Sequence, residues 1–239
     1  MEMEKIKALQ RTELFGCLNT EELAELARRT VELHLKKGEI LFLSGEVAKG
    51  LFVVVNGQIR VFQQNAEGRE QVMHVDSAGS VVAEVAVFDG GPYPASAISE
   101  VDLEVLFIAT QDVHYFCKKY PVLAMRALML MAQRVRRHAQ LVESLCFQEV
   151  GQRLAVFLLT SAQYPAAMPA GGRAAFHLSL SQREIAIRIG SVRDVVARAF
   201  ARLRHDGLIE VENHEVIIPD VQALKLYAET GAIGTPSWN

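Results

Sequence analysis

The sequence predicts a mixed α+β protein that has a β-rich N-terminal part, one long central helix and a C-terminal helix-turn-helix with a strand hairpin. Between Val31 and Thr110, short segments rich in β-branched and aromatic residues alternate with turns that contain glycine. An apolar heptad repeat then runs through residues 121–147. Finally, two helical segments joined by Gly190-Ser191 precede two short strand-like segments. Each of these features is local, so each predicts its own element.

Composition restricts the class of protein. The chain has 239 residues, of which 50% are hydrophobic, and this is enough for two domains with packed cores. The start MEMEKIKALQ is charged and has no apolar run, and no later segment is apolar for long enough to span a bilayer. We therefore expect a cytoplasmic protein with no membrane partner. The 3 cysteines contain no C-x-x-C pair, which argues against a disulfide framework and a closed zinc site.

The β-rich region is expected to form a sandwich or barrel. A short helical opening, TEELAELARRT, precedes it, with Thr20 as the predicted N-cap. Turn signals then separate the strand candidates at the spacing typical of all-β architectures. These candidates are VELHL, EILFLS, LFVVVNG, QIRVFQQ, EQVMHVD, ASAISE and LEVLFIA.

The long helix is predicted from about Pro121 to Phe147, because proline suits the first helical turn and the apolar residues keep a heptad spacing. A heptad seam in the middle of a chain meets another helix. A seam within the chain is one interpretation, but no other segment offers a matching long repeat, so a parallel homodimer is favoured. The predicted dimer interface consists of Met125, Leu128, Ala132, Val135, Ala139, Val142 and Cys146.

The C-terminal helices match the helix-turn-helix pattern. Ser181 and Glu184 form a predicted capping box, Gly190-Ser191 makes the turn, and the second helix runs to about His205. Before it, YPAAMPAGGRAAF reads as a loop, and after it GLIEV and EVIIP flank an Asn-His turn like a wing. The overall net charge is −3, but six arginines stand against two acidic residues between Ser181 and Arg204. This basic segment fits a polyanion partner.

One face of the second helix carries groups that can read DNA bases. Arginine donates two hydrogen bonds to guanine, and a carboxylate accepts from cytosine N4. The residues on this face are Arg193, Asp194, Ala197 and Arg198, and the expected inward face holds Val195, Val196, Ala199 and Leu203. The alternative is a helical hairpin with a salt-bridged outer face. A two-fold dimer fits double-stranded DNA with a palindromic operator, which favours DNA binding.

Taken together, these motifs resemble the CRP/FNR family of bacterial transcription regulators over nearly the whole chain. The segments that carry the resemblance are LFGCLNTEELAELARRT, KKGEILFLSGEVAKGLFVVVNGQIRVF, the long helix and LSLSQREIAIRIGSVRDVVARAFARLRHDGLIEV. The resemblance implies a jelly-roll sensor domain over 1–118, a dimerisation helix over 119–148 and a winged helix-turn-helix domain over 149–239. It also implies allosteric control by an effector and RNA polymerase as a partner. No enzymatic activity is expected, because the sequence shows no P-loop, no nucleophile elbow and no His/Asp/Ser arrangement with motif spacing.

The resemblance also implies roles for single residues. Arg193, Asp194 and Arg198 fall at the family's base-reading positions, and Gln182 falls where the DNA backbone is contacted. Asp194 is one methylene shorter than the usual Glu, and Val192 stands where Ser or Thr often touches a phosphate. The operator is therefore expected to differ from the family's common half-sites.

The effector pocket departs from the family's cyclic-nucleotide branch. Glu84 matches the residue that would bond the ribose, whereas Tyr93, Pro94 and Ala95 stand at the expected Arg-[ST]-Ala of the phosphate loop. On the long helix, His138 and Ala139 replace the Thr and Ser that would meet the adenine. Losing the arginine leaves the phosphate without its partner, so cyclic AMP is not expected to bind.

Other effectors remain open. Three dispersed cysteines do not suit an iron–sulfur cluster. Haem, with one of His34, His74, His114 or His138 as ligand, gives an alternative gas-sensor version of the same regulator. A small apolar or aromatic-acid effector, a redox change at Cys17 or Cys146, or no ligand are further alternatives. A different class of function, a sensor module that regulates a protein partner without DNA, is disfavoured by the basic helix-turn-helix.

Overall fold

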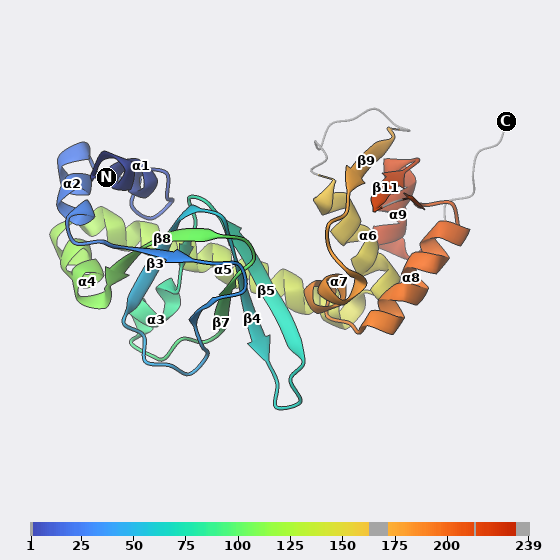
Figure 1. The fold of residues 1–239 in the computed structure, drawn as a ribbon, viewed down its shortest axis with the longest axis horizontal. Coiled ribbons are helices and arrows are strands. Elements are labelled where there is room, and N and C mark those ends of the chain that lie inside the picture. Colours follow the sequence, from blue (N-terminus) through green and yellow to red (C-terminus); the bar gives the residue numbers. More distant parts are fainter. Residues whose placement is uncertain (1, 163–171, 213, 233–239) are drawn as a thin grey trace. The chain divides into compact units, whose positions relative to one another are not determined.

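The computed structural model describes residues 2–162, 172–212 and 214–232. The chain divides into two compact units, Met1–Ala139 and Gln140–Asn239 (Figure 1). The predicted long helix is present as α5 (Pro121–Phe147), and the division between the units falls inside it. Its bounds agree with the prediction from Pro121 and the heptad repeat.

The first unit contains a β jelly-roll, which confirms the predicted fold class. Its strands form two four-stranded sheets with the orders β1-β8-β3-β6 and β2-β7-β4-β5, and all pairings are antiparallel. Each predicted segment contains one strand, and the two-residue β6 was missed because it is too short to show alternation. The bounds are β1 Val31–Leu35, β2 Ile40–Phe42, β3 Gly50–Asn56, β4 Gln58–Gln64, β5 Glu70–Ser77, β6 Val81–Val82, β7 Ser96–Ser99 and β8 Leu103–Ala109.

Strand β3 is apolar on both faces because both faces are covered. Successive side chains of a strand point to opposite sides of the sheet. Leu51 and Val53 accordingly pack with the helices of this unit, whereas Phe52 and Val54 pack with the residues between the two sheets. A continuous apolar run, and not an alternating one, is the sequence signature of such a strand.

Helices cover the outer face of the β1-β8-β3-β6 sheet, and Figure 1 shows α1, α2 and α4 together at one end of the β domain. The prediction included α2 and α5 but not α3, α4 or α1. The stretch from Val31 to Thr110 was interpreted as strands alone, and α3 corrects this. The bounds are α1 Glu2–Gln10, α2 Thr20–Ala27, α3 Glu84–Asp89 and α4 Thr110–Lys119.

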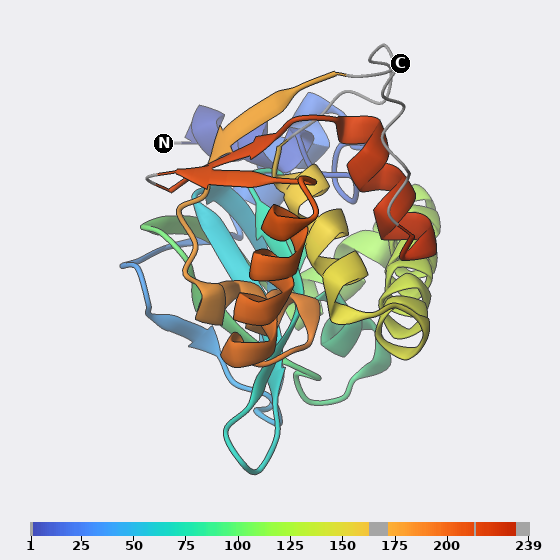
Figure 2. The ribbon, with the colours of Figure 1, turned by 90° about the vertical axis from the view of Figure 1, so that its right-hand side faces the viewer.

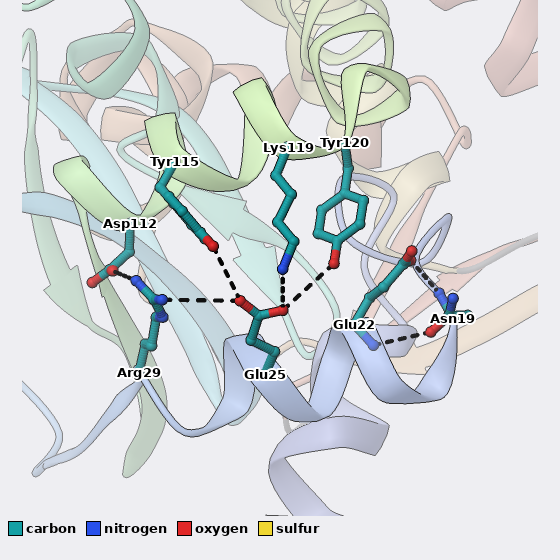
Figure 3. Close-up of polar contacts among 8 residues, drawn as sticks. All are labelled: Asn19, Glu22, Glu25, Arg29, Asp112, Tyr115, Lys119 and Tyr120. Atoms are coloured by element: carbon teal, nitrogen blue, oxygen red, sulfur yellow. Dashed lines mark hydrogen bonds and ion pairs between the residues drawn. The ribbon is translucent and has the colours of Figure 1, made fainter.

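Polar contacts at the surface join α2 to α4 (Figure 3). The Glu25 carboxylate accepts a 2.7 Å hydrogen bond from Lys119 Nζ, and this bond is the main reason that the pKa of Glu25 is lowered. Beside it, Arg29 Nη1 donates to Asp112 Oδ1 at 2.8 Å. Exposed ion pairs of this kind contribute little to stability individually.

The N-cap of α2 is Asn19, so the prediction of Thr20 was wrong by one residue. The Asn19 side chain accepts from Glu22 N at 2.9 Å, and Glu22 Oε2 accepts from Asn19 N at 2.9 Å. Figure 3 shows this reciprocal pair. Asn caps at least as well as Thr, and here Glu stands three residues after Asn19 to complete the capping box.

The second unit consists of helices and a small sheet (Figure 2). Its strands form a three-stranded antiparallel sheet in the order β10-β11-β9. Residues 174–176 were predicted as loop but belong to β9, whose pairing with β11 is not visible in the local sequence. The predicted loop residues 164–171 lie outside the described residues. The bounds are α6 Val150–Ser161, β9 Ala174–His177, α7 Gln182–Ile189, α8 Arg193–His205, β10 Glu210–Glu212, β11 Glu215–Ile218 and α9 Val221–Thr230.

Gly151 allows α6 to approach α9 closely. A Cβ atom built there would overlap the hydroxyl of the buried Tyr227, while the ring carbon Cζ would lie at 3.4 Å. We expect Gly151→Ala to lower the free energy of unfolding by about 1–3 kcal/mol through overpacking. Urea denaturation measures the loss.

The Tyr227→Phe background is the control for this prediction. Without the hydroxyl, the added methyl meets ordinary contacts and also gains up to about 1 kcal/mol of helix propensity. The same Gly151→Ala change is therefore expected to be neutral or stabilising there. If Gly151→Ala lowers the free energy of unfolding equally in the wild type and in Tyr227→Phe, the hydroxyl of Tyr227 is not the cause of the loss.

Candidate functional site

The helix-turn-helix is formed by α7 and α8, with the predicted boundaries. Ser181 accepts from Glu184 N at 3.3 Å and donates its own N–H to Glu184 Oε2 at 2.7 Å, which is the predicted capping box. Gly190 ends α7 in the left-handed conformation, with φ of 67°, which glycine adopts without strain. After Ser191, α8 begins at Arg193 and ends at His205.

The inward face of α8 differs partly from the prediction. Val196 and Leu203 are buried as expected, whereas Val195 and Ala199 are only half-buried. Phe200, which was not predicted, is buried and packs in the same core. The spacing 196, 200, 203 was the available signal, because residues three and four apart share a helix face.

The predicted base-reading residues lie at the start of α8, on its exposed side. The side chains of Arg193 and Asp194 are 71% and 81% exposed and approach each other to only 4.0 Å, so their ion pair is weak. One turn later, Ala197 is half-buried and Arg198 is exposed. In helix-turn-helix proteins the N-terminal residues of the second helix contact base edges, so this face has the required position and chemistry.

Two neighbouring positions lie at the starts of α7 and α8. Gln182 is the first residue of α7 and is half-buried. Val192 is the N-cap of α8 and provides no side-chain hydrogen bond there. Strands β10 and β11 form the predicted wing, and Asn213 of its turn lies outside the described residues.

A cavity of about 120 Å³ lies in the β domain beside the middle of α5, which contributes Arg134 and His138 to its lining. The predicted effector residues Glu84, Pro94, Ala95 and His138 all line it. Its remaining lining consists of Phe42, Val61, Gln63, Met73, His74, Val82, Ala83, Val85 and Arg134.

Tyr93, the fifth predicted effector residue, does not line this cavity. Its ring stacks on Phe42 with centroids 4.2 Å apart, and its hydroxyl donates to Gly50 O at 3.0 Å and accepts from Lys49 N at 3.2 Å. It contributes instead to a different, more open hollow. The loop therefore presents Pro94 and Ala95 to the cavity, and neither carries a charge.

Arg134 is the principal residue that the sequence analysis missed. Its side chain is only 8% exposed, and its Nε donates to Glu84 Oε1 at 2.8 Å. Its Nη2 donates to Val81 O at 2.9 Å and lies 3.4 Å from Asp76 Oδ2. The sequence matched Glu84 to a residue that would bond a ribose, whereas its partner in the structure is this guanidinium. The available signal was the spacing i, i+4 between Arg134 and His138, which places both on one helix face.

Asp76 completes this buried ionic cluster. Burial by itself raises the pKa of the carboxyl, but the hydrogen bonds and charges of His74 and Arg134 outweigh it and hold the pKa below its usual value. His74 Nε2 lies 3.1 Å from Asp76 Oδ2. The cluster therefore places the carboxyl groups of Asp76 and Glu84 around one guanidinium.

The predicted dimer seam lies on the other face of α5. Its seven residues from Met125 to Cys146 are all exposed, including Leu128 at 62% and Val135 at 67%. The residues that α5 buries are Leu123, Ala127, Leu130 and Arg134. An apolar seam at heptad spacing is thus left uncovered in the single chain.

The described residues contain no helix that is long and apolar enough to cross a membrane. Within the same ranges, no three His, Cys, Asp or Glu side chains gather in a metal-binding group.

Comparison with known proteins identifies both units. Residues 32–120 match the family model of the cyclic nucleotide-binding domain, and residues 152–227 match the Crp-like helix-turn-helix domain. The chain is 26% identical to the CRP-like cAMP-activated global transcriptional regulator of Mycobacterium tuberculosis, over 90% of this chain and 96% of that protein. It is 30% identical to the transcriptional activator Anr of Pseudomonas aeruginosa, over 78% and 75% respectively.

A solved structure supports the fold. A CRP/FNR-family putative transcriptional regulator from Eubacterium rectale superimposes with a TM-score of 0.74 at 21% identity, covering 92% of this chain and 100% of that one. These relatives are transcription regulators and not enzymes. The two matched domains, the jelly-roll with its long helix and the helix-turn-helix together show that the chain belongs to the CRP/FNR family of transcription regulators, with a helix-turn-helix DNA-binding domain.

Proposed function

We propose that the protein is a homodimeric, sequence-specific regulator that binds a palindromic operator in double-stranded DNA and acts on RNA polymerase, under the control of an effector other than cyclic AMP. The observation that carries this proposal is the exposed Arg193, Asp194 and Arg198 at the start of α8. The cytoplasm is the compartment in which such a protein meets DNA.

The base-reading role follows from the chemistry of this face. Each arginine can donate two hydrogen bonds to the O6 and N7 atoms of guanine, and Asp194 can accept from cytosine N4. We assign the contact with the DNA backbone to Gln182, at the start of α7. Because the Asp194 side chain is short, its reach into the groove is less than that of a glutamate, which favours a distinct half-site.

The dimer is supported by the exposed seam on α5. Burial of apolar surface in an interface stabilises a dimer by about 25 cal/mol per Å². The seven exposed apolar positions at heptad spacing on α5 provide a continuous surface for a second copy of the chain. We assign the sensor role to residues 1–118, dimerisation to 119–148 and DNA binding to 149–239.

The effector differs from cyclic AMP because the phosphate would lack its loop partner. Pro94 and Ala95 face the cavity where a cationic side chain would be needed, and Arg134 is already engaged by two carboxylates. The cavity volume of about 120 Å³ is also below the range of roughly 300–1,000 Å³ typical of cofactor pockets. This argues equally against haem in this cavity.

Operator selection followed by binding measurements tests the proposal. An operator is selected from random double-stranded DNA with the wild-type protein, and its affinity is measured by fluorescence anisotropy against a scrambled duplex. Arg193→Ala and Arg198→Ala are each expected to weaken operator binding by about 1–3 kcal/mol, because a bidentate guanine contact is lost.

The matched control is Arg204→Ala, which removes an exposed arginine from the other end of α8. It changes the net charge equally, so it lowers specific and nonspecific affinity together. If all three variants keep the same ratio of specific to nonspecific affinity, Arg193 and Arg198 do not read bases. If no selected sequence exceeds the scrambled duplex, the protein is not a sequence-specific binder.

A further inference from the structure

Arg134 has one guanidinium nitrogen without a partner. Its Nε and Nη2 atoms are engaged by Glu84, Asp76 and Val81 O, whereas Nη1 is buried and has no hydrogen-bond acceptor among the described residues. Buried donors in folded proteins are nearly always satisfied, since an unsatisfied donor forfeits its hydration. Because Arg134 lines the cavity, the missing acceptor is expected to come from whatever occupies it.

The charges around the cavity do not favour an anion as that occupant. Asp76 and Glu84 are both buried carboxylates, and the single positive charge of Arg134 can neutralise the negative charge of only one of them. Even if His74 were protonated, its positive charge would only neutralise the second carboxylate. Partial desolvation, together with the charges of His74, Arg134 and Arg137, lowers the pKa of His138, which disfavours its positively charged form. An anion would therefore enter a site with no uncompensated positive charge, which is costly.

The shape and lining of the cavity restrict its occupant further. Most of the surface is apolar, with contributions from Phe42, Val61, Met73, Val82 and Pro94. The volume of about 120 Å³ restricts the enclosed part of the occupant to about the size of a single benzene ring, since an engineered cavity of about 150 Å³ binds benzene.

We propose that this cavity binds a small, uncharged, mostly apolar molecule that carries one carbonyl or hydroxyl oxygen, and that this oxygen accepts a hydrogen bond from Arg134 Nη1. The ligand would be the effector of the regulator, so its role rests on the proposed function, although its binding does not. Arg134 lies on α5 immediately before Val135 of the predicted seam. The ligand would thus contact the helix proposed to form the dimer and could bias its arrangement.

Three compounds of nearly equal shape test the proposal. Acetophenone has a neutral carbonyl, benzoate has a carboxylate, and α-methylstyrene has no acceptor. Binding to the full-length protein at pH 7.5 is followed by the resonance of the Met73 methyl group, labelled with ¹³C and assigned with Met73→Leu. We expect acetophenone to bind with a Kd on the order of millimolar, and the other two roughly tenfold more weakly, because a hydrogen bond to a charged donor is lost or an anion is desolvated.

Two variants locate the binding. Ala95→Leu fills the cavity and is expected to abolish acetophenone binding, whereas Ala66→Leu, at an exposed turn of the same domain, is expected to leave it unchanged. Arg134→Lys keeps the charge but removes Nη1, so acetophenone and α-methylstyrene should then bind equally. Circular dichroism checks that each variant is folded.

Tighter binding of benzoate or cyclic AMP than of acetophenone would overturn the proposal, as would the absence of binding by all three compounds up to their solubility. Operator binding is measured separately without any ligand. If the protein binds an operator specifically but acetophenone does not bind in the cavity, this inference is refuted and the proposed function is left intact. If acetophenone binds in the cavity but no operator is bound specifically, the proposed function is refuted and the ligand-binding inference is left intact.

Discussion

Arg134→Met is expected to lower the free energy of unfolding by about 3–5 kcal/mol, because it leaves Glu84 and Asp76 buried without their common partner. Methionine fills a similar volume, so the loss would come from the uncompensated carboxylates and not from a large void. Urea denaturation at one fixed protein concentration measures it, since the stability of a dimer depends on concentration.

The control for Arg134 is Arg136→Met, which removes an exposed arginine from the same helix. We expect it to change stability by less than about 0.5 kcal/mol. Adding Asp76→Asn and Glu84→Gln to Arg134→Met removes the two buried charges and should restore much of the lost stability. Without such a recovery, the loss would be due to packing.

The pH dependence gives a second signature of the same cluster. Since the pKa of Asp76 is lowered in the folded protein, its contribution to stability is present above its unfolded pKa of about 3.9. That contribution is lost as the pH falls through the lower folded value. In Arg134→Met the charge of Arg134 no longer lowers the pKa of Asp76, so the burial of this carboxyl is expected to raise its pKa and protonation then relieves the buried charge. The stability difference between variant and wild type should therefore narrow from pH 7 towards pH 4, and a constant difference would contradict this explanation.

Val135→Glu is expected to dissociate the proposed dimer. In a parallel seam the two glutamates would face each other, and burying each unpaired carboxylate costs several kcal/mol. The dimer dissociation constant should rise by at least about 10³-fold, which corresponds to roughly 4 kcal/mol. Sedimentation equilibrium measures this dissociation constant. The affinity for a palindromic operator should fall as the dimer dissociates.

Gln133→Glu is the matched control for the seam, because it adds the same charge at an exposed position of α5 that lies outside the heptad seam. It should leave the dimer intact. Should Val135→Glu remain dimeric at the same concentrations as Gln133→Glu, α5 would not pair through this seam.

Local signals in the sequence were sufficient for much of the fold. Strands β1, β4 and β8 have the predicted bounds, because their flanking turns and side-chain pattern are encoded within a few residues. The boundaries of α7 depend on the Ser181 capping box and on Gly190, and both are equally local. Strand β9 was missed because its pairing with β11 joins residues about forty positions apart, which no local pattern records.

The candidate sites likewise combine features that were predictable from local sequence with features that depend on the tertiary structure. The sequence by itself determined the exposed face of α8 and the apolar seam of α5, because helical periodicity decides which residues share a face. Only the tertiary structure decided that Tyr93 turns away from the cavity, and that Arg134 meets Glu84 and Asp76, which are 50 and 58 residues distant in sequence. A buried ion pair forms where two distant segments happen to be packed together, so its partners become evident only once the chain is folded.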